Sequence, residues 1–468
     1  MSKQIRPDYN QQFLLPPRVE DWVPPDHPAR FIREFTAQLD TAELGFRETP
    51  GDDGRPHYAP DVLLCVWLYG YFSRITSTRR LERACMENMA LIWLTGNRAP
   101  DHNTLWRFFD NNKKAIGAAF KQMVRLAAAA DLVGLVLHAV DGTKIKAAAS
   151  NRTALHKKDL EKILAGLDAL IDELAASAQT ARGDDAAEYR LPEELAEAGR
   201  LREKIRGALE AMNNAGLEHA HPEDPDVGMI KCDGRPQFAY NAQAVTDGQS
   251  GLIVAADVVS DAADNHLLVP MTDMVEETLG AAADATLADG GYESGEAIAA
   301  MQEKERGVVL PMKAEREDWE YHSSRFAHDA ARDVVVCPLG EELVYERTKR
   351  CGKRNPELRI YRCKCEGCPA RRECSSDKRG RMIEIGPYHE AVRRQLEKQR
   401  DAANRAKLKK RMGIIERVFA SVKNAMGFRR FTVNGLDGVR AQWSLVCLAY
   451  NLKIMHGWWT AGRLALNN

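Results

Sequence analysis

Three acidic residues in this 468-residue chain are spaced so that a fold could gather their carboxylates. Asp141 ends the buried-type strand that the run LVGLVLHAVDG predicts, Asp289 ends a second predicted strand at 285–289, and Glu416 lies on a predicted helix. Three carboxylates around one point repel each other unless cations neutralise them, and hard divalent ions, above all Mg²⁺, prefer such oxygen ligands. Two such ions clamp the attacking and leaving oxygens of an in-line displacement at phosphorus. The acids therefore predict metal-dependent phosphodiester chemistry.

Basic residues accompany the third acid. Residues 402–426 predict one long helix with a core-facing stripe. The stripe consists of Leu408, Met412, Ile415, Phe419, Val422 and Met426. Helical spacing puts Glu416 and Lys423 at the border of this stripe on the same side, within reach of a cleft beside a sheet. We expect Lys423, with Arg429 and Arg430 after Gly427, to hold backbone phosphates.

Other polar residues compete for these roles. Asp257 lies inside the strand-like run LIVAADVV and Asp247 in a predicted hairpin turn, and on composition alone either could be the second acid. Asp101 and His102 in the turn APDHN, and His138 beside Asp141, are typical of helix caps or satisfied core residues.

Six of the ten cysteines fall in one short stretch, which in a cytosolic protein suggests a metal before disulfides. They are Cys337, Cys351, Cys363, Cys365, Cys368 and Cys374. The spacing Cys365-x2-Cys368-x5-Cys374 resembles a metal knuckle, and Cys337 could close a tetrahedral Zn²⁺ site. Cys363 competes with Cys365, Cys351 is a spare, and unliganded thiols are the alternative to zinc. The scattered cysteines predict buried thiols: Cys65, Cys85, Cys232 and Cys447.

The elements that must position the acids follow a mixed order. Setting aside a helical hairpin, the predicted order is three strands, a helix, a strand, a helix and a strand. This is the order of the RNase H-like (retroviral integrase-like) fold, a mixed α/β sheet covered by helices. The first and fourth strands are neighbours in such a sheet, so Asp141 and Asp289 should converge.

The chain divides into five predicted parts. Residues 1–130 form a helical amino-terminal domain, in which 75–95 and 104–129 are either a DNA-binding helix-turn-helix or a plain helical unit. The other parts are the catalytic core (131–313 and 401–430), a helical hairpin insertion (151–220), a Cys-rich basic insertion (314–400) and a carboxyl-terminal helical segment (431–468).

Composition and charge narrow the class of protein. Hydrophobic residues make up 44% and charged residues 28% of the chain, close to the averages for globular proteins, which excludes wholesale disorder. The longest apolar stretch, 62–72, is about half of the ~20 residues that a membrane span needs, and the amino terminus lacks a signal-peptide core, so we expect a cytoplasmic protein. The net charge of −1 hides a net +14 at residues 341–430, which is the electrostatic footprint of a polyanion ligand such as nucleic acid.

Six segments match one known family. They are YGYFSRITSTRRLE, APDHNTLWRF, AVDGTKIKA, YNAQAVTD, LADGGYES and IIERVFASVKNAMGFRRF. The chain resembles the bacterial insertion-sequence transposases of the Asp-Asp-Glu (DDE) class, and most of all the group with an amino-terminal helical domain and a cysteine-containing insertion. The resemblance covers nearly the whole chain and aligns LADGGY, rather than Asp257, with the second acid.

The resemblance implies a site and its partners. Asp141, Asp289 and Glu416 would be the catalytic triad and hold Mg²⁺ or Mn²⁺, and the substrates would be double-stranded element ends and target DNA. In related transposases one helix carries Tyr, two residues, Arg, three residues, Glu, six residues and Lys. Here Glu416 and Lys423 keep the last interval, Lys409 and Met412 replace the Tyr and Arg, and Arg411 stands one residue from the Arg position.

The resemblance further implies a homodimer on paired DNA ends, no membrane partner, and a nucleoid-associated protein of the bacterial cytoplasm. Two alternatives stay open. One is an RNase H-like nuclease that only hydrolyses DNA, and the other is a catalytically retired, transposase-derived DNA-binding protein.

Overall fold

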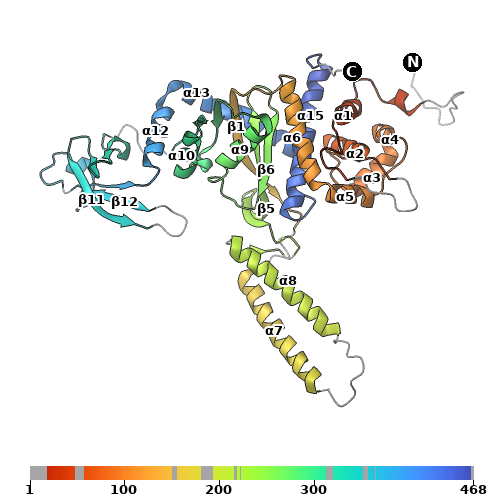
Figure 1. Ribbon diagram of the computed structural model, residues 1–468, viewed down its shortest axis with the longest axis horizontal. Coiled ribbons are helices and arrows are strands. Elements are labelled where there is room, and N and C mark those ends of the chain that lie inside the picture. Colours follow the sequence, from red (N-terminus) through yellow and green to blue (C-terminus); the bar gives the residue numbers. More distant parts are fainter. Residues whose placement is uncertain are drawn as a thin grey trace, which may run out of the picture.

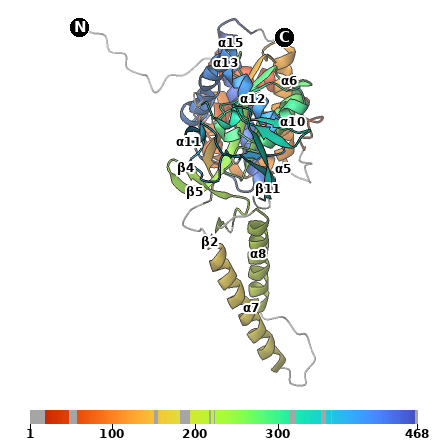
Figure 2. The same cartoon turned by 90° about the vertical axis from the view of Figure 1, so that its left-hand side faces the viewer.

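The computed structural model describes residues 18–47, 57–149, 155–180, 193–215, 219–221, 223–312, 320–350, 357–363 and 365–464. Figure 1 shows amino-terminal helices at one end, a six-stranded sheet in the middle and a five-stranded sheet at the other end. A helical hairpin projects from the middle part in both Figure 1 and Figure 2. These helices and sheets make a mixed α/β fold. No helix of the described residues is long and apolar enough to cross a membrane.

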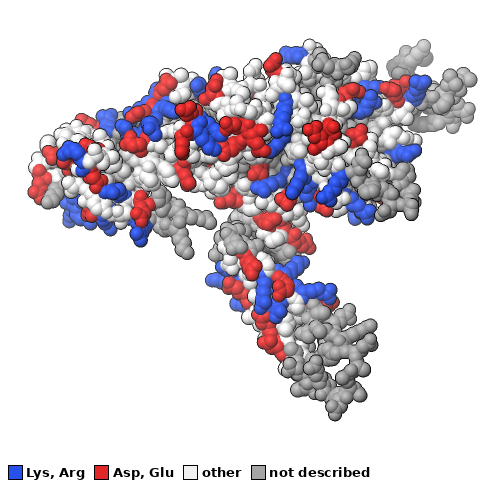
Figure 3. All heavy atoms as spheres, viewed as in Figure 1, with Lys and Arg blue, Asp and Glu red and all other residues white. Residues whose placement is uncertain are grey.

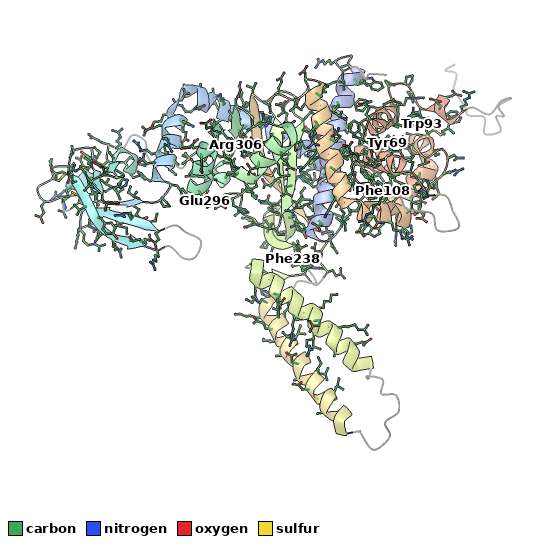
Figure 4. The ribbon with its side chains drawn as sticks, viewed as in Figure 1. Tyr69, Trp93, Phe108, Phe238, Glu296 and Arg306 are labelled. Atoms are coloured by element: carbon green, nitrogen blue, oxygen red, sulfur yellow. The ribbon has the colours of Figure 1, made fainter. Side chains whose placement is uncertain are left out.

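Apolar residues at helical spacing build the amino-terminal part, as the sequence predicts. Its helices are α1 (Pro28–Ala37), α2 (Pro60–Phe72), α3 (Thr78–Glu87), α4 (Met89–Leu94), α5 (His102–Asn111) and α6 (Lys113–Ala129). Tyr69, Trp93 and Phe108 mark this part in Figure 4, and the guanidinium groups of Arg30 and Arg33 lie 4.9 and 4.7 Å from the Trp93 ring. α3 packs against both α4 and α5. Whether this unit binds DNA stays a prediction.

The six-stranded sheet is the centre of the molecule. Its strands are β1 (Leu137–Lys146), β4 (Gly228–Cys232), β5 (Arg235–Asp247), β6 (Ile253–Val259), β7 (Ala285–Leu287) and β8 (Val308–Val309). The order is β4-β5-β1-β7-β8, with β6 also paired to β5. β5 is antiparallel to β1, β4 and β6, whereas β1, β7 and β8 are parallel. β4 was not predicted, and it pairs with residues 235–239 of β5 while β6 pairs with residues 241–246.

Helices from distant parts of the chain cover this sheet. They are α6, α9 (Leu268–Leu279), α10 (Gly295–Glu303) and α15 (Leu436–Thr460). α15 is buried on nearly all sides because it packs against β6, α6 and α2. The indole nitrogen of Trp443 on α15 donates to the carbonyl oxygen of Gln243 (2.9 Å), and the Asn451 amide pairs with the backbone of Ile253. The amino-terminal helices and the sheet therefore share one core.

The predicted helical hairpin is present as α7 (Lys157–Thr180) and α8 (Glu193–Ala215), closed at its base by β2 (Leu155–His156) and β3 (His219–Ala220). Its small core contains Leu160, Ile205, Leu209 and Met212. The sequence predicts that Ile163, Leu170 and Leu201 belong to the apolar stripes of these two helices, but all three are exposed. It also predicts a loop at residues 183–185, which lie outside the described residues. In Figure 4, Phe238 marks the place where the hairpin meets the sheet.

The five-stranded sheet follows β8 in the chain and is ordered β13-β12-β11-β10-β9. Its elements are β9 (Ala327–Asp329), β10 (Val334–Val336), β11 (Glu342–Lys349), β12 (Leu358–Arg362), α11 (Arg371–Cys374) and β13 (Met382–Ile385). α12 (His389–Arg400) leads back to the central part, where the Gln395 side chain donates to the carbonyl oxygen of Val308 (3.1 Å).

The predicted long helix at 402–426 is interrupted by two wider turns. α13 (Ala402–Arg411) and α14 (Arg417–Ala420) are each followed by a π-helical segment, Met412–Glu416 and Ser421–Ala425. A π turn closes a hydrogen bond to the fifth residue instead of the fourth, so it rotates all later residues relative to an α-helical stripe. Four residues of the predicted stripe are nevertheless buried: Ile415, Phe419, Val422 and Met426. The prediction is wrong at Met412, which is 58% exposed, and Ile414 and Val418 are also buried.

Candidate active site

Two neighbouring parallel strands bring Asp141 and Asp289 to the same level of the sheet. Ala139 of β1 pairs with Leu287 of β7, and this is the last pair between the two strands. Asp141 and Asp289 each lie two residues beyond that pair. β7 ends there whereas β1 continues to Lys146, so Asp141 lies inside its strand. The prediction that Asp141 ends its strand is wrong, because residues 142–146 continue the antiparallel pairing with β5.

Asp141 is a mostly buried carboxylate with Arg411 as its cationic partner. Its Oδ2 atom lies 2.8 Å from Nη1 of Arg411, and both side chains are mostly buried, with exposed fractions of 17% and 16%. Burial raises the pKa of Asp141, the Arg411 guanidinium and the Gly142 amide oppose this rise, and the nearby charge of Asp289 adds to it. The two carboxylates thus repel each other, and a cation between them would relieve that repulsion.

Asp289 begins a tight turn instead of continuing the strand. Its Oδ1 atom accepts a hydrogen bond from the amide of Gly291 (2.8 Å) at the start of the turn Gly290–Tyr292. A Cβ atom on Gly291 would lie 2.9 Å from this oxygen and 3.7 Å from a carboxylate oxygen of Asp264. The missing side chain therefore lets the backbone approach both acids closely.

Glu416 is not gathered with the two aspartates. It is the last residue of the first π-helical segment, its side chain is exposed, and it has no ion-pair partner among the residues that the structure describes. The expectation that Glu416 and Lys423 share one border of an α-helical stripe assumed an uninterrupted helix. The two residues differ in exposure, since Glu416 is exposed and Lys423 is partly buried.

Lys423 and its basic neighbours gather at the carboxyl end of β1. The Lys423 ammonium group donates to the carbonyl oxygen of Lys144 (3.2 Å), and Phe431, just after Arg430, donates its amide to the carbonyl of Lys146 (2.8 Å). Lys146, Lys423 and Arg429 all lower the pKa of Asp233, with Lys146 contributing most, so these cations lie close together. Arg429 and Arg430 are exposed.

A buried polar network beside the acids was not predicted. The Asp264 carboxylate accepts hydrogen bonds from the side-chain amides of Asn241 (2.6 Å) and Gln243 (2.9 Å), and it lies 3.4 Å from the ammonium group of Lys144. The Tyr292 hydroxyl donates to Gln243. Burial raises the pKa of Tyr292, and the charges of Asp264, Asp141 and Asp289 raise it further. The network therefore lies close to both aspartates.

The sequence held a signal for this network. Asn241 and Gln243 are two residues apart in the otherwise apolar stretch 238–245 of β5, so their side chains share one face, and both are fully buried. Buried amides need hydrogen-bond partners, which here come from a loop residue, Asp264.

The competing residues have structural partners. Asp257 on β6 lies 2.8 Å from the Arg440 guanidinium of α15, and Asp247 accepts hydrogen bonds from the amide and hydroxyl of Ser250.

His138 is buried and contacts the carbonyl of Gly134 (2.9 Å). Asp101 caps α5 by accepting from the Thr104 amide (2.6 Å). His102 at the first turn of α5 lies 2.8 Å from Glu82.

The cysteines divide as the sequence suggests. Cys65, Cys85, Cys232 and Cys447 are buried thiols. Five of the six clustered cysteines line one cavity of the five-stranded sheet, and Cys351 lies outside the described residues.

No ready-made metal centre is present in the described part of the chain, where no three His, Cys, Asp or Glu side chains are grouped closely enough to hold an ion. The donor chemistry of Asp141 and Asp289 nevertheless fits a hard divalent cation, since both are oxygen ligands and their charges repel each other. The set of metal ligands is incomplete for two reasons. Glu416 is not grouped with the two aspartates, and the Arg411 guanidinium lies against a carboxylate oxygen of Asp141.

The surface charge is mixed on the face that Figure 3 shows. Basic and acidic side chains alternate over the central part, and basic side chains also gather at the end with the five-stranded sheet. The excess of Lys and Arg in residues 341–430 is therefore spread over several elements.

Comparison with known families gives two matches. A family model described as "Transposase DDE domain" matches residues 336–456, and one described as "Transposase domain (DUF772)" matches residues 17–111. The first range contains Arg411, Glu416 and Lys423, whereas Asp141 and Asp289 lie outside both ranges. No curated protein and no solved structure matches the chain.

Proposed function

Since the two matches identify the chain as an insertion-sequence transposase of the DDE class, we propose that it binds the terminal inverted repeats of its own element, cleaves there and joins the freed end to target DNA. The proposed partners are double-stranded element ends and target DNA, and the proposed active form is a homodimer on paired ends, at the nucleoid in the bacterial cytoplasm.

The strand order supports an RNase H-like core for this chemistry. If the short β4 is set aside, the order of strands across this sheet is β6-β5-β1-β7-β8. Counted along the chain, these are the third, second, first, fourth and fifth strands of the sheet. The first three strands are antiparallel neighbours and the last two run parallel to the first. We propose that the parts predicted from the sequence, with the core at 131–313 and 401–430, are the working units of this protein.

The shared level of Asp141 and Asp289 on adjacent parallel strands is the observation that carries the proposal. We assign these two carboxylates and Glu416 as the groups that would hold Mg²⁺ or Mn²⁺. The bound ions would clamp the attacking and leaving oxygens of an in-line displacement at phosphorus.

Both chemical steps use the same acids because both are displacements at phosphorus. In the first step a water oxygen forms a bond to phosphorus, and the 3′ oxygen leaves and takes up a proton. In the second step the freed 3′ oxygen forms the new bond to a target phosphorus and loses its proton, and the target 3′ oxygen leaves. Lys423, Arg429 and Arg430 at the end of β1 would hold the backbone phosphates during both steps.

Glu416 must move to complete the triad, and Arg411 must release Asp141. We propose that bound DNA supports both changes, because its phosphates offer Arg411 an alternative anionic partner. The π-helical segment that ends in Glu416 already packs on β1 and β5, so the change needed at Glu416 is a local one. This assigns Arg411 a phosphate-holding role only in the DNA-bound state.

The test is incubation of the protein with the element ends and Mg²⁺, followed by separation of nicked and joined products on a sequencing gel. Asp141→Asn, Asp289→Asn and Glu416→Gln should each abolish cleavage and leave DNA binding nearly intact. Asp261→Asn, an exposed loop acid, is the matched control and should keep full activity.

Three results would change the assignment. Full activity in any of the three variants would remove that residue from the site. Nicked products without joined products would indicate a nuclease that only hydrolyses. Binding of the ends without cleavage, with Mg²⁺ or Mn²⁺, would indicate a catalytically retired DNA-binding protein.

A further inference from the structure

Five thiols from two separate segments meet in the five-stranded sheet. Cys337 directly follows β10, and the others lie between the end of β12 and the end of α11. All five line the same cavity: Cys337, Cys363, Cys365, Cys368 and Cys374. Thiols from two separate segments that line one cavity could together supply the ligands of a metal ion.

The backbone around these thiols has the features of a metal-binding loop. The amide of Glu341 donates to Sγ of Cys337 (3.2 Å) and so fixes the position of this thiol just after β10. Cys365 has a φ of 50° and Gly367 a φ of 76°, so the segment before Cys368 turns tightly. This turn lets two cysteines that are close in sequence face one cavity.

Burial separates Cys363 from the other four thiols of the cavity. Cys363 is buried and belongs to the apolar core of the sheet. The other four are partly exposed: Cys337, Cys365, Cys368 and Cys374. The four partly exposed thiols are therefore the candidates for a set of metal ligands.

The sheet has a small core of its own. Its buried members are Phe326, Val335, Leu343, Tyr361, Cys363, Ile383 and Ile385. A folding unit with so few apolar side chains is commonly completed by a bound metal, whose binding energy is then folding energy.

We propose that Cys337, Cys365, Cys368 and Cys374 bind one structural Zn²⁺, which joins the loop after β10 to the loop between β12 and β13. Four thiolates close a tetrahedral zinc site and leave no open position for catalysis. As they stand, the thiols line the cavity without being grouped closely enough to hold the ion, so zinc binding draws the two loops together. Cys363 stays outside the site as a core residue.

Metal analysis of the full chain tests this directly. Protein purified with zinc present throughout should contain about one zinc per chain. Replacement of zinc by Co²⁺ should produce the absorption bands of thiolate-bound cobalt. Cys368→Ser and Cys374→Ser should each lose the zinc, and removal of zinc from the unchanged protein by a chelator should open the segment 327–385 to protease.

Two matched variants sharpen the test. Cys363→Ser removes a thiol of the same cavity and should keep the zinc, as should Cys232→Ser, a buried thiol of β4. The proposal is overturned if the unchanged protein holds no zinc under these conditions, or if Cys368→Ser and Cys374→Ser retain it. Loss of zinc from Cys363→Ser with retention in Cys365→Ser would move the fourth ligand to Cys363 and overturn the assigned set.

Discussion

The ion pair between Arg411 and Asp141 gives the sharpest prediction for the DNA-free protein. We expect Arg411→Met to destabilise the fold in EDTA at neutral pH, because it keeps most of the aliphatic volume but leaves a mostly buried carboxylate unpaired. Two unit charges about 4 Å apart attract by about 4 kcal/mol at an effective dielectric constant of about 20, and by about 1 kcal/mol in water. Since the two side chains are 16% and 17% exposed, we expect a loss between these limits, about 2 kcal/mol.

The pH dependence of this loss has a definite sign. Arg411 lowers the pKa of Asp141 against the larger effect of burial, so its removal raises that pKa further above the ordinary value of an aspartate. The folded protein then favours protonated Asp141, and the free energy penalty of the charged form appears only as the pH rises through this pKa. The difference in stability between Arg411→Met and the unchanged protein should therefore vanish at acidic pH and be complete at neutral pH.

The assay is thermal unfolding in EDTA across this pH range, repeated at neutral pH with added Mg²⁺. Mg²⁺ should stabilise Arg411→Met more than the unchanged protein, because in the variant a cation does not compete with the guanidinium for Asp141. Arg405→Met, which removes an exposed arginine of the same helix, is the control. Equal stability, pH dependence and Mg²⁺ response in the two variants would refute the reasoning and show that the ion pair does not form in solution.

Three further changes probe the surroundings of the acids. Asp264→Asn should reduce the cleavage rate by about 10- to 100-fold, because it weakens a network that borders Asp289, while the exposed loop variant Asp261→Asn should not reduce it. Equal cleavage rates in the two variants would contradict this. Gly142→Ala should lower the free energy of unfolding by about 1–3 kcal/mol, because its Cβ would lie 2.7 Å from Oδ1 of Asn241 and closer still to Gln243. The control Gly166→Ala on α7 has open space around its Cβ and should not destabilise the fold. Chemical denaturation measures both variants, and an unchanged free energy of unfolding in Gly142→Ala would show that the network can move aside. Neutralising Lys423, Arg429 and Arg430 together should weaken binding to element ends and to random DNA alike. It should also reduce the slope of the logarithm of the binding constant against the logarithm of the salt concentration by about 2–3. A change in sequence preference alone would mean that these residues contact bases.

The two aspartates could be predicted because their positions follow from local sequence. A run of apolar residues marks each strand, and the helix α9 before β7 gives the connection that parallel neighbours need. The strand order of such a sheet predicts that the two aspartates converge, and the pairing of Ala139 with Leu287 sets the level at which they do so. Strand β4 was missed because GMIKC is short, and it is a strand only because β5 extends to pair with it.

Loop residues set the limit of prediction for the polar network. Asn241 and Gln243 could be recognised as unusual in an apolar strand, but nothing near them in sequence identifies Asp264 as their acceptor. The partner is fixed by the path of residues 260–267 after β6, which the tertiary fold determines. Sequence can therefore indicate that a buried partner is required without indicating which residue supplies it.

The helix of Glu416 shows why a correct element can still misplace its side chains. Residues 402–426 are helical, as predicted, yet the prediction assumed 3.6 residues per turn throughout. In the second π segment the amide of Met426 bonds to the carbonyl of Ser421, five residues earlier, and each such turn shifts the side chains that follow. The first π segment separates Arg411, which holds Asp141, from Glu416, which faces solvent. Because the same turn links these two residues, a change in its winding would alter both the ion pair and the direction of the third acid.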